Sequence, residues 1–316
     1  KAVSDKIKEI KPDIFINCVS PLDASKIIQK TCKKEGIKYF TWLQDVYSEA
    51  TKAVLTKKYN ILGKIIGFYY EFIESKLLRK SEHIISITED FIPLLETWRI
   101  KREKIRVIHN WANIHDISLK EKNNAWALKN DLHDKFCFLY SGTLGFKHNP
   151  ALLSKLALYF KDIPNVRVIV ISEGQGADWL RKEKAIKKND NLIIINYQPF
   201  EQLADVLATG DVLISILEQE AGIYSVPSKV LTYLCAKRPL LLAVPTGNLA
   251  ARIVKENNMG LVVNPLDMNS FFEAAFELYN NSKKRKMLGK NARKYAENNF
   301  NIENIANSFL KTFSIN

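Results

Sequence analysis

Gly142 and Lys147 have the residue types and the spacing to hold a phosphate group. They lie in "LYSGTLGFKHNPALL", where a strand-like apolar run passes through a turn with two glycines into a helix-like stretch. Without a side chain, glycine lets backbone N–H groups approach a ligand closely, and a lysine ammonium supplies a point charge. The stretch matches neither GxxxxGK[ST] nor GxGxxG. It indicates a phosphate-binding loop, with an ordinary glycine turn as the alternative.

Two further loops carry residues that suit an anion. In "VISEGQGADWL", Glu173 and Gly174 follow an apolar run. In "SVPSKVLTYLCAKRP", Pro227, Ser228 and Lys229 precede an apolar helix. Ser228 can cap the first turn of that helix, and the helix dipole and Lys229 both favour negative charge there. Plain turns and a capped core helix are the simpler alternatives, but three such loops together predict a site for a nucleotide diphosphate.

Strand-like apolar runs alternate with helix-like stretches along the whole chain. Ten runs are expected to be strands: "DIFINCV", "IKYFTWL", "HIISIT", "KIRVIH", "FCFLYS", "VRVIVIS", "LIIIN", "DVLISI", "PLLLAV" and "MGLVV". This alternation is typical of parallel sheets that helices cover on both faces. Because ligands bind beyond the carboxyl ends of such strands, we expect the three loops to meet at one sheet edge. The sequence therefore predicts an α/β protein with two Rossmann-like domains.

The ten runs divide unequally between the two domains. Four lie before residue 110 and six lie after it. We expect the polar stretch 115–135 to be the linker between the domains. The N-terminal domain should cover residues 1–118 and be incomplete, because its leading βα units are missing. The C-terminal domain should cover residues 119–300 and hold a complete Rossmann sheet.

The composition is that of an ordinary soluble protein with excess positive charge. The net charge is +13, and residues 1–115 hold 21 basic and 14 acidic side chains, a net +7. Basic surfaces attract anionic membranes, nucleic acids or phosphorylated substrates. No zinc-binding spacing, RNP-like motif or arginine-rich arm indicates nucleic acid. We therefore expect an anionic membrane surface or a phosphate-bearing ligand, and no nucleic-acid partner.

One stretch, "LGKIIGFYYEFIESKLLRK" at 62–80, mixes aromatic and basic side chains. It fits a helix that lies on an anionic membrane, or a core helix with a solvated basic face, and we favour the core helix. The apolar runs are far shorter than the roughly 20 residues that span a bilayer. The four cysteines form no CxxC pair, which indicates structural thiols in a reducing cytoplasm.

Nine stretches together resemble bacterial glycosyltransferases of family 4, which have the GT-B fold. They are "KPDIFINCVSPL", "WLQDVYSEA", "HIISITEDF", "KIRVIHNWAN", "FLYSGTLGFKHNPALL", "SEGQGADWL", "YQPFEQLADVLATGDVLI", "SVPSKVLTYLCAKRPLLLAV" and "GLVVNPLD". They occur in the family's order, cover nearly all of the chain, and are most similar to the branch acting in O-antigen, colanic acid and capsule synthesis. The resemblance implies a retaining, metal-independent hexosyl- or N-acetylhexosaminyltransferase without a cofactor. Its donor would be a UDP- or GDP-linked sugar.

The resemblance also assigns roles to the residues of the diphosphate site. Gly142 and the neighbouring Thr143 would approach the diphosphate, and Lys147 would neutralise it as it leaves. Charge develops on the leaving phosphate in the transition state, so a fixed cation there lowers the barrier. Ser228 and Lys229 would bind the same diphosphate from the start of the helix.

The other implied roles concern the nucleoside, the sugar and the acceptor. Glu173, Gly174 and the "YQPF" turn around Gln198 would line the nucleoside pocket. Thr232 stands where the family often has the glutamate that holds the ribose, a departure that affects the choice of nucleotide and sugar. Asp45 ends a strand of the first domain and would orient the acceptor hydroxyl, with a helix cap or loop contact as the alternative.

The family context supplies expectations for the acceptor and the location. The acceptor would be a saccharide on a polyprenyl diphosphate, used by a cytoplasmic protein at the inner face of the membrane. The terminal helix, residues 301–316, would pack back on the N-terminal domain. Nothing in the chain matches the strand and glycine-rich loop with which relatives usually begin. The alternatives are therefore a non-catalytic nucleotide-sugar-binding subunit, a truncated inactive homologue or, less in keeping with the motifs, a nucleotide-sugar epimerase.

Overall fold

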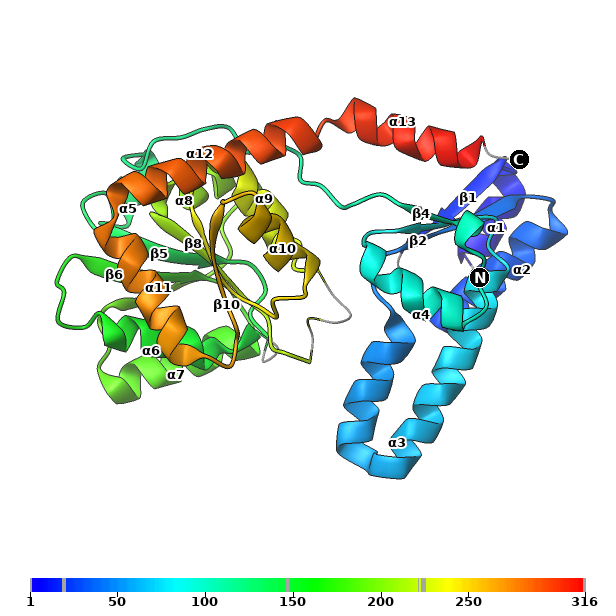
Figure 1. The fold of residues 1–316 in the computed structure, drawn as a ribbon, viewed down its shortest axis with the longest axis horizontal. Coiled ribbons are helices and arrows are strands. Elements are labelled where there is room, and N and C mark those ends of the chain that lie inside the picture. The colour runs from blue at the N-terminus through cyan, green and yellow to red at the C-terminus, as the bar shows by residue number, and fades with distance from the viewer. Residues whose placement is uncertain (1, 19–20, 146–147, 221, 223–225, 315–316) are drawn as a thin grey trace. The chain divides into compact units, whose positions relative to one another are not determined.

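The protein contains two compact units, each built on a parallel sheet. The structure is a computed structural model that describes residues 2–18, 21–145, 148–220, 222 and 226–314 (Figure 1). The first unit comprises residues 1–110 and 303–316, and the second comprises residues 111–302. The sheets have four and six strands, and every strand pair is parallel. The expected fold class, an α/β protein with two Rossmann-like sheets, is confirmed.

The sheet of the first unit has the strand order β1-β2-β3-β4. Its strands are β1 (Ile14–Asn17), β2 (Lys38–Leu43), β3 (Ile84–Ser86) and β4 (Ile105–Val107). All four fall in the runs predicted as strands. Ile84 of β3 pairs with Ile105 of β4 in register, and both side chains are fully buried.

The helices of the first unit include one that comes from the far end of the chain. They are α1 (Ala2–Ile10), α2 (Leu22–Lys34), α3 (Tyr47–Arg79), the 3-10 turns η1 (Glu89–Phe91) and η2 (Arg102–Lys104), α4 (Ile92–Thr97) and α13 (Ile302–Phe313). The Phe309 ring of α13 meets the Trp42 ring of β2 edge-on at 5.1 Å, and Phe313 meets Phe40 in the same way at 5.0 Å.

Helix α3 is a hairpin of two antiparallel arms (Figure 1). Asn60 has φ 50° and ψ −120°, which breaks the helix and reverses the chain. The arms approach closely at Gly63, where an added Cβ would lie 2.0 Å from the carbonyl oxygen of Leu55. Lys52 on the first arm contacts Glu71 on the second at 3.0 Å. Of the helices in the described ranges, this one included, none is both long enough and apolar enough to cross a bilayer.

The second unit has the strand order β10-β9-β8-β5-β6-β7. Its strands are β5 (Phe136–Ser141), β6 (Val166–Ile171), β7 (Leu192–Ile195), β8 (Val212–Ile216), β9 (Leu240–Ala243) and β10 (Gly260–Val263). Numbered from β5, this is the order of a complete Rossmann sheet, in which the direction of winding reverses between β5 and β8. Ligands bind at this switch point in open α/β sheets.

Helices cover both faces of the second sheet, because its strands are apolar on both sides. Cys137 and Leu139 of β5 enter one buried cluster, and Phe138 and Tyr140 enter the other. The first face carries α5 (Ala125–Lys129), α8 (Leu203–Thr209), α9 (Lys229–Cys235), α10 (Leu249–Glu256) and α12 (Ser282–Asn299). The second face carries α6 (Pro150–Tyr159), α7 (Gln175–Lys187) and α11 (Met268–Asn280).

The stretch 115–135 differs from the expected linker. Ile117, Trp126 and Leu132 are at most 4% exposed and belong to the core of the second unit. Asn124 caps α5 by accepting the Ala127 N–H at 3.0 Å. The stretch was predicted as a linker because most of its residues are polar, but its few large apolar side chains pack in the core and fix it to the second unit. The division between the units accordingly lies after Asn110, whereas we had placed it after residue 118.

Candidate functional site

A cavity of about 690 Å³ opens in the second unit, where the loops after β5 and β8 meet the start of α9. It therefore lies at the switch point of the sheet. Sixteen described residues line it: Trp111, Ala112, Asn113, Asp116, Ile117, Gly142, Thr143, His148, Phe200, Leu203, Leu217, Val226, Pro227, Ser228, Lys229 and Thr232. Six of the predicted donor-binding residues are among them: Gly142, Thr143, Pro227, Ser228, Lys229 and Thr232.

Gly142 forms the turn that follows β5. Its φ of +127° is a conformation that residues with a side chain rarely adopt. The Gly142 N–H bonds the carbonyl of Ile171 at 3.0 Å, which ties the turn to the end of β6. A Cβ added here would lie 3.4 Å from Cε and 3.5 Å from Nζ of Lys229. The turn and the lysine thus occupy the same small volume, although 87 positions separate them in the sequence.

The Lys229 ammonium is held in place on the cavity wall. It donates hydrogen bonds to the Tyr140 hydroxyl and, at 3.2 Å, to the Thr143 carbonyl. It also lies 3.7 Å from the centre of the Tyr140 ring, a cation–π contact. The Tyr140 hydroxyl donates to the Thr143 carbonyl at 2.7 Å. Burial raises the pKa of Tyr140 well above its usual range, so this hydroxyl stays protonated and neutral beside the cation.

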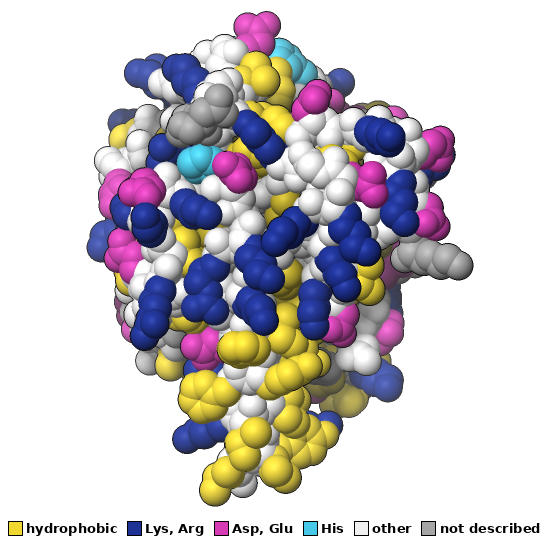
Figure 2. Space-filling model, turned by 90° about the vertical axis from the view of Figure 1, so that its right-hand side faces the viewer, with side chains coloured by type: hydrophobic (Ala, Val, Ile, Leu, Met, Phe, Trp, Pro, Cys, Tyr) yellow, Lys and Arg dark blue, Asp and Glu magenta, His cyan; other side chains and the backbone are white. Residues whose placement is uncertain are grey.

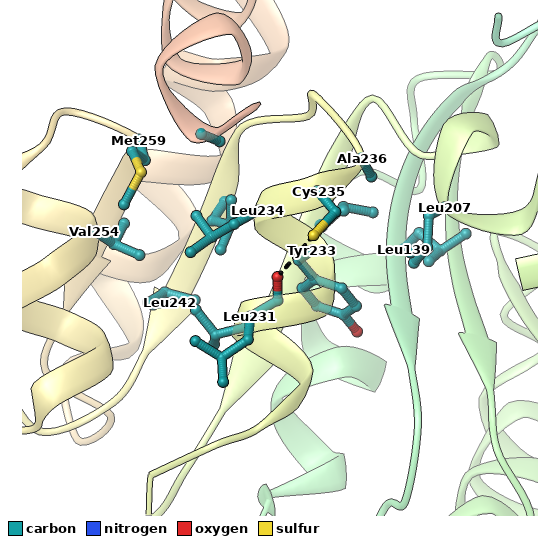
Figure 3. Packing of buried hydrophobic residues seen from close by; sticks show 14 of the residues in the cluster. Leu139, Leu207, Leu231, Tyr233, Leu234, Cys235, Ala236, Leu242, Val254 and Met259 are labelled. Carbon is teal, nitrogen blue, oxygen red and sulfur yellow. Dashed lines mark hydrogen bonds between the residues drawn. The ribbon is translucent and has the colours of Figure 1, made fainter. Parts of the chain in front are cut away.

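Tyr233 fixes α9 to the end of β5. Its hydroxyl accepts the Ser141 N–H and donates to the Ser141 carbonyl, both at 2.8 Å. Figure 3 shows the ring projecting from α9 towards the strand that carries Leu139, while Leu234 points to the side of Leu242. The buried ring thereby sets the position of Lys229, one helical turn earlier, relative to the Gly142 turn.

The start of α9 differs from the expected capped helix in one respect. Ser228 occupies the N-cap position, but its side chain makes no capping hydrogen bond and its backbone is already helical. Ser228 is exposed at the cavity wall instead, and Pro227 beside it is buried. Because α9 has seven residues, its dipole is small, and the Lys229 charge is the larger electrostatic feature at this end.

The three residues predicted to line the nucleoside pocket lie on neighbouring loops, outside the described lining of the cavity. The Glu173 carboxylate accepts the Tyr197 N–H at 3.1 Å, and Gly174 begins α7 in an exposed position. The Gln198 amide accepts from the Trp126 indole N–H and donates to the Asn196 carbonyl, both at 2.9 Å. Glu173 and Gln198 therefore shape the loop after β7, and direct contact with a nucleoside stays a prediction.

Neither of the two predicted catalytic residues is among the described residues that line this cavity. Lys147 lies outside the described residues. Asp45 belongs to the first unit, where it is exposed at a small cavity of about 130 Å³ that Cys18 and Glu74 also line. Their roles stay predictions.

Sequence reasoning missed several residues of the site. Tyr140 and Tyr233 sit inside apolar strand and helix runs, where nothing local distinguishes them from core residues. Trp111 follows β4 in a segment without a ligand-binding pattern. Phe200 belongs to the "YQPF" turn that the resemblance assigns to the nucleoside pocket, and it lines the cavity together with Trp111. His148 also lines the cavity, and its Nδ1 accepts the Gly145 N–H at 3.0 Å.

Within the described ranges, no group of three or more His, Cys, Asp and Glu side chains is arranged to hold a metal ion. Cys32, Cys137 and Cys235 are buried, and Cys18 is exposed. Burial raises the pKa of the Cys137 and Cys235 thiols to about 12, so both are protonated and unreactive at neutral pH.

This chain is similar in fold to several solved structures. The Anabaena protein Alr3699/HepE, solved with UDP-glucose, gives a TM-score of 0.77 at 12% identity and is matched over 99% of this chain and 81% of that one. Sucrose-phosphate synthase from Thermosynechococcus elongatus gives 0.77 at 15% identity, over 99% and 75% of the two chains. At such identities the likeness shows the fold, which is GT-B.

Sequence comparison identifies the family. An uncharacterized glycosyltransferase of Methanocaldococcus jannaschii is 18% identical over 275 residues, which are 85% of this chain and 67% of that protein. The model of the family "Glycosyl transferases group 1" matches residues 123–295, which include the whole sheet of the second unit and most of the cavity lining. Because the match covers more than half of the chain, this protein belongs to the glycosyl transferases group 1 family.

Proposed function

We propose that this protein transfers a sugar from a nucleotide-sugar donor to a saccharide carried on a polyprenyl diphosphate. The transfer would retain the configuration of the anomeric carbon and serve the synthesis of a cell-surface polysaccharide. Family membership supports the transferase activity. The proposed donor is based on the cavity described above. The proposed acceptor and the retention of configuration are based on the resemblance to family 4 enzymes.

The observation that carries the donor proposal is the position of the Lys229 ammonium at the Gly142 turn. The cavity wall there offers a fixed cation, a turn without a side chain and the exposed Ser228 hydroxyl. A nucleoside diphosphate bound against this wall would place its phosphates next to the cation. As the bond to the sugar breaks, negative charge grows on the leaving phosphate, and Lys229 stabilises it without reorganisation.

The lining favours a nucleotide in the rest of the cavity. Trp111 and Phe200 offer aromatic surface for a base, and Asn113 and Asp116 offer polar atoms for a ribose or base. The related fold of Alr3699/HepE was solved with UDP and with UDP-glucose. We therefore propose UDP before GDP as the nucleotide, and a hexose or N-acetylhexosamine as the sugar.

Lysine side chains would supply the positive charge that the leaving diphosphate needs. Lys229 lies in the described site, and Lys147 belongs to the phosphate-binding loop that the sequence indicates after Gly142. In this proposal the reaction needs neither a metal ion nor a cofactor. Nucleotide binding should then persist after dialysis against EDTA, and its loss would overturn this part of the proposal.

The acceptor side belongs to the first unit in this proposal. Asp45 would orient the acceptor hydroxyl, and the protein would work in the cytoplasm at the anionic inner face of the membrane, where lipid-linked saccharides are extended. The excess of basic side chains in residues 1–115 supports such a location.

The test of the donor site is calorimetric titration of the chain with UDP and with GDP. We expect saturable binding, and Lys229→Gln should weaken it roughly 10- to 100-fold, the effect of losing one or more charge-assisted hydrogen bonds. Lys255→Gln, on the exposed surface of α10, is the matched control and should bind as the parent does. Equal affinities in the parent and Lys229→Gln would sink the proposed site.

A turnover assay separates the transferase from a non-catalytic sugar-nucleotide-binding subunit. The observation that favours the binding subunit is Thr232, which lines the cavity. The enzymes that this sequence resembles often have a glutamate at that position. Binding of a UDP-sugar, followed by transfer of its sugar to a polyprenyl-diphosphate saccharide and release of free UDP, supports the transferase. Binding without release across such acceptors supports the subunit.

A further inference from the structure

The second arm of the α3 hairpin turns a continuous apolar face to the solvent. Its exposed fractions lie between 41% and 74% for seven large side chains: Ile61, Leu62, Ile65, Ile66, Phe68, Tyr69 and Phe72. At 100° per residue these positions cover an arc of about 160° on the helix. Contiguous apolar patches of this kind are rare on soluble proteins and mark interaction sites. The stretch 62–80 is therefore a core helix only at its C-terminal end, where Leu77 and Leu78 are buried, and not over the exposed apolar face of residues 61–72.

The hairpin itself explains why this face points outward. The arms pack through Gly63 and Gly67, whose added Cβ atoms would lie within 3 Å of Leu55 and Lys52. The Glu71 carboxylate accepts from Lys52 and from the Trp98 indole N–H, both at 3.0 Å. The small and polar residues of the arm thus fill the inner side, and the large apolar residues are left outside.

A basic groove adjoins this apolar face. It is a cavity of about 960 Å³ between α2, the start of β2 and the end of α3. Seven lysines line it, all of them exposed, and Glu82 is the acidic residue among its described lining. Phe72 lines the groove and also ends the apolar face, so the two surfaces are continuous.

Helical periodicity places two of these lysines in line with the apolar face. Lys76 follows Phe72 by one turn, and Lys80 follows by two. In the lower part of Figure 2 apolar side chains gather together, and Lys and Arg side chains lie directly above them. The surface therefore changes from apolar to strongly basic along a single direction.

We propose that the α3 hairpin is a monotopic membrane anchor. The apolar face of residues 61–72 enters the interfacial region of one leaflet, and the lysine groove binds the anionic headgroups around it. Lys57, Lys58 and Lys64 lie near the tip, so the hairpin stays at interfacial depth, where their stems can extend back to the headgroups.

The charge distribution favours a lipid surface over a protein partner. Interface cores between proteins are depleted in lysine, whereas anionic leaflets attract clusters of lysine next to apolar anchors. The inference deepens the membrane location proposed above and rests on that proposal for its biological purpose. Its structural basis is confined to the first unit, so it can fail while the donor site stands.

Vesicle flotation of the full chain tests the anchor. The vesicles are phosphatidylcholine alone, or phosphatidylcholine with about 30% phosphatidylglycerol as the anionic lipid. We expect binding to the anionic vesicles, reduced at least tenfold by the triple substitution Ile61→Gln, Leu62→Gln and Ile65→Gln. The matched control replaces Val3, Ile10 and Leu310, three exposed apolar residues elsewhere in the first unit, with glutamine and should bind normally.

A second set of substitutions tests the lysine groove. Replacing Lys33, Lys76 and Lys80 with glutamine should remove the preference for anionic over zwitterionic vesicles. UDP titration of every variant keeps the two proposals apart. Lost flotation with unchanged UDP affinity supports the anchor, whereas unchanged flotation in the apolar variant overturns it, whatever happens at the donor site.

An environment-sensitive fluorophore reports insertion directly. In a Cys18→Ser background the three remaining cysteines are buried, so Leu62→Cys can be labelled selectively. Emission should shift to the blue and rise on adding anionic vesicles at position 62, but not at the control Leu310→Cys. No shift at position 62 would contradict insertion. Self-association in sedimentation velocity that the apolar variant abolishes, without vesicle binding by the parent, would make the face a contact between copies and overturn the proposal.

Discussion

At the scale of single residues, the Tyr233 hydroxyl holds the site together. It satisfies both the N–H and the carbonyl of Ser141, at the point where β5 passes into the Gly142 turn. Tyr233→Phe would leave these two groups without their buried partner, which typically costs about 1–3 kcal/mol. We expect a loss of this size in the free energy of unfolding, measured by urea denaturation, together with weaker nucleotide binding.

The control for this change is Tyr159→Phe. Tyr159 is 46% exposed on α6, and removing a hydroxyl there should alter the free energy of unfolding by less than about 0.5 kcal/mol. Equal effects at the two positions would contradict the role given to Tyr233.

Residue types in the sequence predicted part of the site. Gly142 and Lys229 were recognised because glycine turns and lysines at helix starts bind anions through local chemistry. Their contact, with Lys229 3.5 Å from the place where a Gly142 Cβ would lie, depends on β5 and β8 being neighbours in the sheet. For Gln198 the local pattern was less informative. Its amide accepts a hydrogen bond from the Trp126 indole, and no local pattern reveals this partner.

At the scale of elements, Glu74 links the two ends of the α3 hairpin. Its carboxylate is 4% exposed and accepts the N–H groups of Tyr47 and Ser48, at 3.1 and 2.8 Å, so the second arm caps the first. Burial raises the pKa of Glu74, although these hydrogen bonds act in the opposite direction. The folded protein therefore holds the Glu74 proton more tightly than the unfolded chain does.

This shift gives stability a definite dependence on pH. The tighter proton binding of Glu74 in the folded state adds to the free energy of unfolding. This contribution is complete below the ordinary pKa of 4.5 and is lost as the pH rises through the raised pKa of the folded state. We therefore expect the free energy of unfolding of the parent, relative to Glu74→Gln, to fall as the pH rises above 4.5. Urea denaturation at several values between about pH 4 and 8 measures it; a difference independent of pH would contradict the shift.

The sequence predicted the elements better than their environment. All ten strands lie in the predicted runs, since continuous apolar segments of strand length must be buried on both faces. The predicted burial of the stretch 62–80 was wrong for residues 62–72, because apolar residues alone do not say whether another element covers them. The second arm packs against the first through Gly63 and Gly67. The first arm therefore covers the face that carries the glycines and leaves the large apolar side chains exposed.

At the scale of the molecule, the chain leaves the first unit after Asn110 and returns to it at Glu303. The returning helix buries Phe309, 9% exposed, against Trp42 of β2. Phe309→Ala should cost about 3–5 kcal/mol, the usual range for removing a buried phenylalanine. Hydrogen exchange should then be faster in peptides of β1 to β4.

The neighbouring Leu310 provides a close control for this prediction. It is 58% exposed on the same helix, so Leu310→Ala should leave the exchange of these peptides as in the parent. Unchanged exchange in Phe309→Ala would show that α13 does not stabilise the first unit.

The sequence by itself determined the parallel α/β architecture, the positions of the ten strands along the chain and the loops that carry Gly142 and Lys229. These follow from patterns of neighbouring residues, because apolar runs must be buried and glycine or lysine acts within its own loop. The tertiary structure decided what no local pattern contains: the union of Gly142, Tyr140 and Lys229 at the switch point of the sheet, the burial of Trp126 in an apparently polar linker, and the exposure of the α3 face. Each depends on which elements become neighbours, and that choice is made by packing across the whole unit.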